Sequence, residues 1–229
     1  GGQTQGTLGM CGAGSLVGNG LTSTSNYVNT GWATNLGTSS WTISFKTSNI
    51  TPSATLFYIL GDPGATSFRC FTNGVAGANN WLLRGPLTDV LVTGGATVAP
   101  HTITFVYDNT LNNVRAYLDG VLNNTVAQGA LNINGAGPFK VGGYGSNIGL
   151  PTGGLMDEFR IYNRALTPTE ITDIAGCPSV GGPVCTGVPI TFDIRVNPSG
   201  TVNPVPNQTV CKGQPTTAVN FTSTVPGTN

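Results

Sequence analysis

Charge is what this 229-residue chain has least of. Asp, Glu, Lys and Arg make up 8% of it, against a usual ~25%, and the formal net charge is zero. Nucleic acid and anionic membranes attract basic surfaces, so neither partner is expected. No apolar run approaches the roughly 20 residues that span a bilayer, so direct membrane insertion is not expected either. The start at Gly1-Gly2-Gln3 carries no signal peptide and indicates an interior cut or a processed end.

The chain also has few residues that could catalyse hydrolysis. Glycosidases pair two carboxyl groups about 5–9.5 Å apart, but the chain has two Glu only, and adjacent Asp157 and Glu158 on a strand would point to opposite faces. His101 is the single His, which disfavours a serine or cysteine hydrolase. GxSxG, GxGxxG and P-loop strings in their proper context are absent. The sequence therefore predicts a protein that is not an enzyme.

The five cysteines form no CxxC pair, so a zinc site is not expected. Cys177 and Cys185 flank Gly-Gly-Pro and could close a small loop, and Cys11–Cys70 is a possible second pair. Cys211 would then be left over. Disulfides of this kind would indicate an oxidising compartment.

What the chain does have is Gly (34), Pro (15) and many Thr, Asn and Ser, with aromatic residues spaced along short alternating segments. This pattern predicts short strands joined by tight turns. The strongest single signal is Asp119-Gly120 between two apolar runs, which predicts a hairpin. Eleven or twelve short strands without a long helix predict an all-β sandwich of two sheets.

The stretch GGLMDEFRIYNRALTPTEI, residues 153–171, carries five of the eighteen charged residues. Its alternation predicts a strand, followed by a short helix with Pro168 at an early position and Glu170 in the first turn. Arg160, Arg164 and Glu158 are expected to pin the chain end rather than to contact a ligand. The alternation places on one face Leu155, Asp157, Phe159 and Ile161, and on the other Met156, Glu158, Arg160 and Tyr162.

This stretch closely resembles the C-terminal signature of the laminin-G-like, concanavalin-A-like jelly rolls, G-(L/I)-(I/M)-D-E-(V/F)-R-I-Y-N-R-A-L. WTISF (41–45), HTITFVYDNTLNNVRAYLDGVL (101–122) and, more distantly, NGLTSTSNYV (19–28) resemble other segments of that family. The resemblance covers about residues 15–175. It implies a concanavalin-A-like jelly roll of two antiparallel sheets over residues 1–176.

After Gly176 the pattern of the sequence changes. Residues 177–198 are interpreted as a linker with the last strand of an Ig-like module (PITFDIRV, 189–196), and 199–229 as the incomplete start of the next repeat. This order resembles the junctions between PKD-like (Ig-like) repeats in giant surface adhesins of Bacteroidetes. Residues 199–229 are too few to bury a core of their own, so the chain is expected to be part of a longer protein.

The resemblance also suggests ligands. Members of this superfamily often hold a structural Ca²⁺ with Asp, Asn and backbone oxygens, and the corresponding positions here are Asn19 and Asp157, with Asn19 replacing a carboxylate. For sugar binding, exposed aromatic rings next to planar polar groups are needed. That criterion selects Trp32, Trp81, Arg84 and Tyr144.

By resemblance, the chain is a module of a large secreted, repetitive cell-surface adhesin. It would sit outside the cell, attached to the outer membrane, and bind glycans or solid surfaces. Its other partners would be neighbouring repeats and the type IX secretion machinery, with a role in gliding motility or biofilm formation. A purely structural spacer and a polysaccharide-binding accessory module of a secreted enzyme stay open as alternatives.

Overall fold

A computed structural model describes residues 4–6, 9–12, 14–24 and 26–177, and near the C-terminus residues 207, 208, 212, 213, 215, 217 and 218. The chain divides into two units, Gly1–Val184 and Cys185–Asn229. In the second unit, Gln208 and Thr217 exchange hydrogen bonds: the Gln208 amide donates to the Thr217 carbonyl at 2.9 Å, and the Thr217 N–H donates to Gln208 Oε1 at 2.7 Å. The Ig-like strand expected at 189–196 lies outside the described residues.

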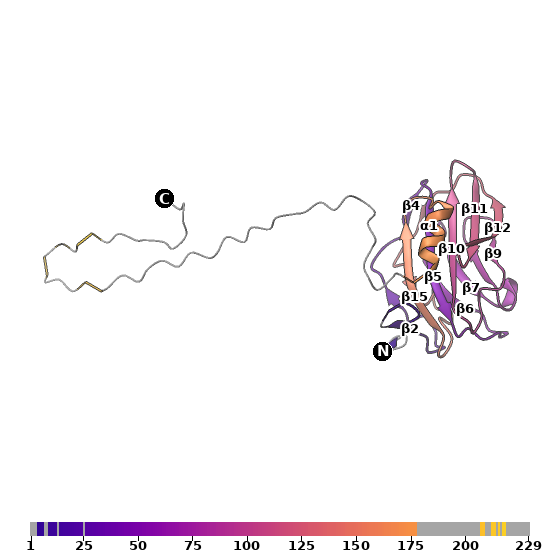
Figure 1. The fold of residues 1–229 in the computed structure, drawn as a ribbon, viewed down its shortest axis with the longest axis horizontal. Coiled ribbons are helices and arrows are strands. Elements are labelled where there is room, and N and C mark those ends of the chain that lie inside the picture. Colours follow the sequence, from indigo (N-terminus) through magenta and orange to yellow (C-terminus); the bar gives the residue numbers. More distant parts are fainter. Residues whose placement is uncertain are drawn as a thin grey trace. The chain divides into compact units, whose positions relative to one another are not determined.

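The first unit is a sandwich of antiparallel sheets (Figure 1), which confirms the predicted all-β jelly roll. The seven-stranded sheet runs in the order β1 (Thr4–Gly6), β2 (Ser15–Val17), β15 (Leu155–Tyr162), β5 (Trp41–Ser48), β10 (His101–Asp108), β11 (Asn113–Leu118) and β12 (Val121–Ala127). The six-stranded sheet runs in the order β3 (Val28–Asn29), β14 (Lys140–Val141), β6 (Phe57–Gly61), β7 (Arg69–Thr72), β8 (Trp81–Arg84) and β9 (Val90–Val92). A small third sheet pairs β4 (Asn35–Gly37) with β13 (Ile133–Asn134).

The described part of this unit also contains two short helices, the 3₁₀ turn η1 (Gly74–Ala76) and the helix α1 (Pro168–Ala175). α1 begins with the capping box formed by Thr167 and Glu170 and has Pro168 in its first turn, as the sequence predicts. Among the described residues, no helix is long and apolar enough to cross a bilayer.

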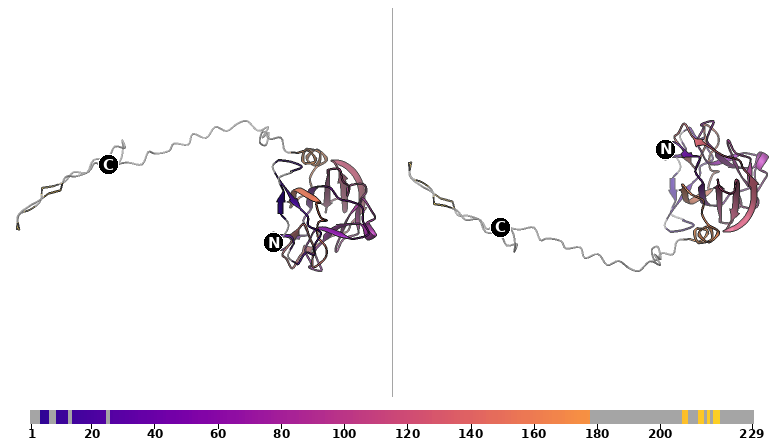
Figure 2. Two further views of the ribbon diagram at one scale, coloured as in Figure 1. Left: turned by 90° about the horizontal axis from the view of Figure 1, so that it is seen from below. Right: turned by 90° about the horizontal axis from the view of Figure 1, so that it is seen from above.

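The main core lies between the two large sheets, because alternate residues of each strand face the opposite sheet. Trp41 and Phe45 of β5 and Phe105 of β10 are fully buried there against Trp81 of β8 and other apolar side chains. The other face of the seven-stranded sheet is covered by the 163–175 segment. α1 lies against this face of the sheet (Figure 2). Ile171 of α1 and Leu166 pack there with Val106 and Tyr117.

β15 lies between β2 and β5 and contains a β-bulge. Its register against β5 shifts between Asp157 and Arg160, and Glu158 has a φ of 51°. An inserted residue changes which face each later side chain occupies. Met156 therefore faces the core before the bulge, and Phe159 and Ile161 pack against the core after it. The prediction that Leu155, Asp157, Phe159 and Ile161 share one face was wrong for this reason.

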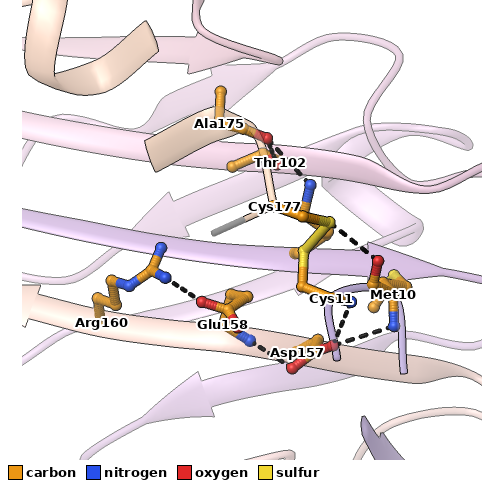
Figure 3. The surroundings of a disulfide bond; sticks show 9 residues. Met10, Cys11, Thr102, Asp157, Glu158, Arg160, Ala175 and Cys177 are labelled. Atoms are coloured by element: carbon orange, nitrogen blue, oxygen red, sulfur yellow. Dashed lines mark hydrogen bonds and ion pairs between the residues drawn. A yellow bond between two sulfur atoms is a disulfide. The ribbon is translucent and has the colours of Figure 1, made fainter. Parts of the chain in front are cut away.

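The two ends of the domain are fastened together (Figure 3). Cys11 and Cys177 form a disulfide with Cα atoms 5.1 Å apart, although 166 positions separate them in the sequence. Asp157 Oδ2 accepts hydrogen bonds from the backbone N–H groups of Met10 (3.0 Å) and Cys11 (2.9 Å). The carbonyl of Ala175 accepts from Lys46 Nζ at 3.0 Å and from Thr102 Oγ1 at 2.8 Å, which ties the end of α1 to β5 and β10.

This disulfide corrects both expected cysteine pairs. Cys11 does not pair with Cys70, whose free thiol is completely buried in the main core and has its pKa raised by that burial. Cys177 does not pair with Cys185, which lies outside the described residues. Local spacing favoured the short loop, but the fold brings the distant Cys11 to Cys177.

Candidate functional site

An open groove of about 670 Å³ lies between the loop carrying β4 and the second half of β15. Its lining combines aromatic and aliphatic side chains with three polar ones. The lining residues are Trp32, Asn35, Leu36, Ser39, Phe159, Ile161, Tyr162 and Asn163. We call this the Trp32 groove.

The indole of Trp32 is held in place from two sides. Its Nε1–H donates to Asn35 Oδ1 at 2.7 Å, and its ring packs on Phe139 with centroids 5.6 Å apart. Phe139 in turn stacks on Phe159 of β15 at 5.9 Å and 26°. The row of rings continues into the core, while the Trp32 side chain stays partly exposed at the groove.

The loop that carries Trp32 is organised by Asp62, a carboxylate with 1% exposure. Asp62 Oδ2 accepts from Thr34 Oγ1 (2.9 Å), from the Thr34 N–H (3.3 Å) and from the Gly137 N–H (2.9 Å), and Oδ1 accepts from the Gly64 N–H at 2.9 Å. Burial alone would raise the pKa of Asp62, but these hydrogen bonds to the ionised form outweigh it and lower the pKa below its usual value. Asp62 thus joins three loops, and its role was missed from the sequence.

The opposite wall of the groove depends on the β15 bulge. By shifting the alternation, the bulge brings Phe159 and Ile161 to the inner side of the strand, where they form both groove wall and core margin. The charged residues of this region are paired among themselves: Arg160 with Glu158, and Arg164 with Glu170. The first pair lies within β15 and the second joins the turn to α1, so the expectation that these residues pin the chain end stays a prediction.

A second set of polar and aromatic side chains lies on the outer face of the six-stranded sheet. We call it the arginine–aromatic face. Arg69 of β7 and Arg84 of β8 are direct neighbours in the register of the two strands. The rings of Tyr58, Phe71 and Tyr144 lie beside them. Arg84 and Tyr144, both predicted as ligand contacts, belong to this face and not to the Trp32 groove.

Comparison with known families agrees with this architecture. A laminin G family model, described as the concanavalin A-like lectin/glucanases superfamily, matches residues 22–172, more than half of the chain. The chain belongs to the concanavalin A-like lectin/glucanases superfamily. No curated protein sequence gives a significant match to this concanavalin A-like domain.

Solved structures share the fold of the domain at low sequence identity. The binding domain of Paraclostridial Mosquitocidal Protein 1 is 14% identical with a TM-score of 0.56, and the match covers 76% of this chain and 46% of that one. A putative carbohydrate binding protein from Bacteroides ovatus is 17% identical with a TM-score of 0.50, over 64% and 42% of the two chains. Domain 4 of AbnA, an extracellular arabinanase from Geobacillus stearothermophilus solved with arabinotriose, is 20% identical with a TM-score of 0.50, over 77% and 82%. This chain spans less than half the length of the first two.

Trp81 does not belong to any exposed surface of the concanavalin A-like domain. Its side chain is completely buried, its Nε1–H donates to the Gly95 carbonyl at 3.0 Å, and its ring meets Phe45 edge-on at 6.1 Å. The prediction that Trp81 contacts a ligand was therefore wrong. The Asn79-Asn80 pair before it indicated a loop, whereas Trp81 is the first residue of strand β8, which lies between β7 and β9.

The two residues expected to hold calcium serve different turns. Asn19 Nδ2 donates to Asn26 Oδ1 at 2.9 Å, and Asn19 Oδ1 accepts from the Leu21 N–H at 3.1 Å. Asp157 accepts three backbone N–H groups, those of Met10 and Cys11 on Oδ2 and that of Glu158 on Oδ1. Calcium takes 6–8 oxygen ligands, and these two side chains do not offer a shared set. Within the described part of the chain, no group of three or more His, Cys, Asp or Glu is arranged to hold a metal. Calcium binding stays a prediction.

Proposed function

We propose that the concanavalin A-like domain is a non-enzymatic glycan-binding module that takes a neutral sugar chain in the Trp32 groove. The observation that carries this proposal is the partly exposed indole of Trp32, fixed by Asn35 and by Phe139 at the side of an open groove. Sugar rings present C–H faces that pack on aromatic rings, and hydroxyl groups that pair with amides and hydroxyls. Ser39, Tyr162 and Asn163 supply those polar groups at the groove.

The same lining supports binding rather than hydrolysis. Cleavage of a glycosidic bond uses two carboxyl groups facing each other across the sugar. Among the residues that the structure describes, no Asp or Glu lines the Trp32 groove. Glu158, next to it in β15, is already paired with Arg160.

The wider setting that we propose is a large secreted, repetitive cell-surface adhesin, with roles in attachment and in gliding motility or biofilm formation. The similarity of the 189–229 sequence to junctions between PKD-like repeats supports it. The Cys11–Cys177 disulfide fits an extracellular location, because such bonds persist in oxidising compartments. An accessory module of a secreted enzyme would use the groove in the same way, whereas a structural spacer would leave it empty.

The test is a glycan array screened with the purified chain, followed by calorimetric titration of the neutral oligosaccharide that is retained. Trp32→Ala should weaken that binding about tenfold or more, which corresponds to ~1.4 kcal/mol. Trp32→Phe keeps a ring but loses the N–H, so its affinity should lie between those of Trp32→Ala and the unmodified chain. Leu122→Ala, which removes an exposed side chain from edge strand β12, is the control and should bind like the unmodified chain.

Thermal unfolding of each variant separates loss of binding from loss of fold. Retention of no glycan by the folded chain would favour the spacer. Binding that is unaffected in a folded Trp32→Ala variant would place the glycan elsewhere and refute the proposed site.

A further inference from the structure

Arg69 and Arg84 stand directly opposite each other on neighbouring strands of the six-stranded sheet. Both lie on its outer face, since Phe71 and Leu82, two positions away in β7 and β8, pack in the cluster outside the main core. Directly opposed side chains have Cβ atoms about 4.5–5.5 Å apart, and like charges in that position destabilise a sheet. The chain has only nine Lys and Arg residues in all. Two of them share this one cross-strand position.

The charge of this pair is only half compensated. Arg84 Nε donates to Asp89 Oδ1 at 2.8 Å, and Arg84 Nη2 also contacts the Asp89 carboxylate. This pairing raises the pKa of Arg84 and lowers that of Asp89, to which Arg69 adds only a smaller attraction through space. The Arg69 side chain makes no hydrogen bond or ion pair with any described residue, and its guanidinium lies 5.5 Å from the centroid of the Tyr144 ring. One positive charge on the face is therefore without a carboxylate in direct contact.

Aromatic rings border the two guanidinium groups. Tyr144 stacks on Tyr58 at 5.3 Å and 23°, and Tyr58 packs on Phe71 at 5.1 Å. The Arg84 guanidinium lies 5.6 Å from the Phe71 centroid. The hydroxyl groups of Tyr58 and Tyr144 have no hydrogen-bond partner within the described part of the chain. These hydroxyls add two unpaired polar groups beside the unpaired guanidinium.

Glycine sets the position of Tyr144. A Cβ added at Gly61 would lie 2.6 Å from Tyr144 Cδ2, so the ring can rest on strand β6 only because residue 61 has no side chain. The cluster is thus built from a loop and three strands of one sheet. α1 packs on the other sheet. On this face Ala76 of η1 packs with Phe71 and Leu82, while the side chains of Tyr58, Arg69, Arg84 and Tyr144 stay partly exposed.

We propose that the arginine–aromatic face is a second binding site, separate from the Trp32 groove, that takes a carboxylate-bearing sugar chain such as a polyuronate. The planar guanidinium of Arg69 matches a carboxylate with two parallel N–H···O bonds. The Tyr58 and Tyr144 hydroxyls pair with the sugar hydroxyls. A bound carboxylate also supplies the negative charge that the opposed arginines lack.

The experiment is a calorimetric titration of the full chain with tri-galacturonate, and with galactotriose as the neutral counterpart that differs at the carboxyl groups. Tri-galacturonate should bind, and its affinity should fall as NaCl is raised, because salt screens the ionic contact. Arg69→Gln should weaken this binding about tenfold or more. Arg69→Lys, which keeps the charge without the planar fork, should weaken it less.

Asp89→Asn gives the opposite prediction. Neutralising Asp89 leaves Arg84 without its counter-charge, so the affinity for tri-galacturonate should rise severalfold. A variant that merely damaged the sheet would lower it. Arg164→Gln, which removes the same charge from the turn before α1, is the matched control and should change nothing.

Trp32→Ala should leave tri-galacturonate binding unchanged, so the proposals for this site and for the Trp32 groove can be tested independently. The proposal is overturned if tri-galacturonate does not bind, if it binds no better than galactotriose, or if a folded Arg69→Gln variant binds as well as the unmodified chain. A heparin-derived sulfated oligosaccharide that binds in place of tri-galacturonate would overturn the assignment to carboxylates.

Discussion

Thr34 and Asp62, 28 positions apart, are joined by two hydrogen bonds to one carboxylate oxygen: the Thr34 hydroxyl donates at 2.9 Å and its N–H at 3.3 Å. Gly64 and Gly137 donate to the same carboxylate. The loop carrying Trp32 is therefore fixed by an ionised side chain that is itself buried. This relationship makes the shape of the Trp32 groove depend on a single acid.

The domain should become less stable as the pH falls, because Asp62 becomes protonated at low pH. Its pKa in the folded state is lowered, so its contribution is fully present above the unfolded value of about 3.9 and is lost as pH falls through the lower folded value. Asp62→Asn should destabilise the domain by about 1–3 kcal/mol at pH 7 because buried N–H groups lose an ionised acceptor. Urea unfolding from pH 7 to pH 2 measures both effects. An Asp62→Asn variant with the pH dependence of the unmodified chain would contradict the role.

The disulfide should contribute substantially to stability. Closing a loop of this length restricts the unfolded chain, and removal of a native disulfide typically costs about 2–5 kcal/mol. The double variant Cys11→Ser and Cys177→Ser should therefore unfold at a lower urea concentration. The same shift should appear on reduction of the unmodified chain, and reduction should not shift the double variant further. An unchanged midpoint would argue against the bond.

Glu170 should titrate far below an ordinary glutamate. Its pKa is lowered to about 2, chiefly by the Arg164 guanidinium and further by the N–H and hydroxyl groups of Thr167. The chain has only two glutamates, so carbon-13 labelling of Glu gives two carboxyl signals to follow by NMR. Arg164→Gln should raise the pKa of Glu170, and Thr167→Ala should raise it less. An ordinary pKa in the unmodified chain would disprove the pairing.

Substitutions of Glu158 should differ in their effect on stability, because this residue lies in the bulge of β15. A φ of 51° is open to Gly and costly for β-branched residues. Both Glu158→Gly and Glu158→Val lose the contact with Arg160, so the loss of this ion pair does not contribute to the difference between them. Val should be less stable than Gly by about 1–2 kcal/mol. Equal unfolding midpoints for the two variants would show that the bulge is not retained.

Features that depend on adjacent residues were predictable from the sequence. Asp119 and Gly120 have φ values of 51° and 82° and join β11 to β12, as the Asp-Gly pair predicts. The capped start of α1 was predictable for the same reason. Gly31 before Trp32 correctly placed that indole outside the strands.

Features that depend on register or on distant partners were not predictable. No Gly marks the bulge in β15, so strict alternation was assumed across it. The sequence carries no signal for Arg69, because only the pairing of β7 with β8 places it opposite Arg84. The pairing of Cys11 with Cys177 follows from the position of β15 beside β2 and β5, which spacing along the chain does not reveal.

The Cys11–Cys177 bond has a mechanical consequence. Tension applied to the chain on either side of these two cysteines passes directly from one sulfur to the other. Of the described strands, only β1 lies outside the bond, so pulling can detach β1 from β2 but cannot peel β15 from β5 while the bond is intact. Both binding surfaces would keep their shape under a force that stretches whatever is attached outside the covalent link.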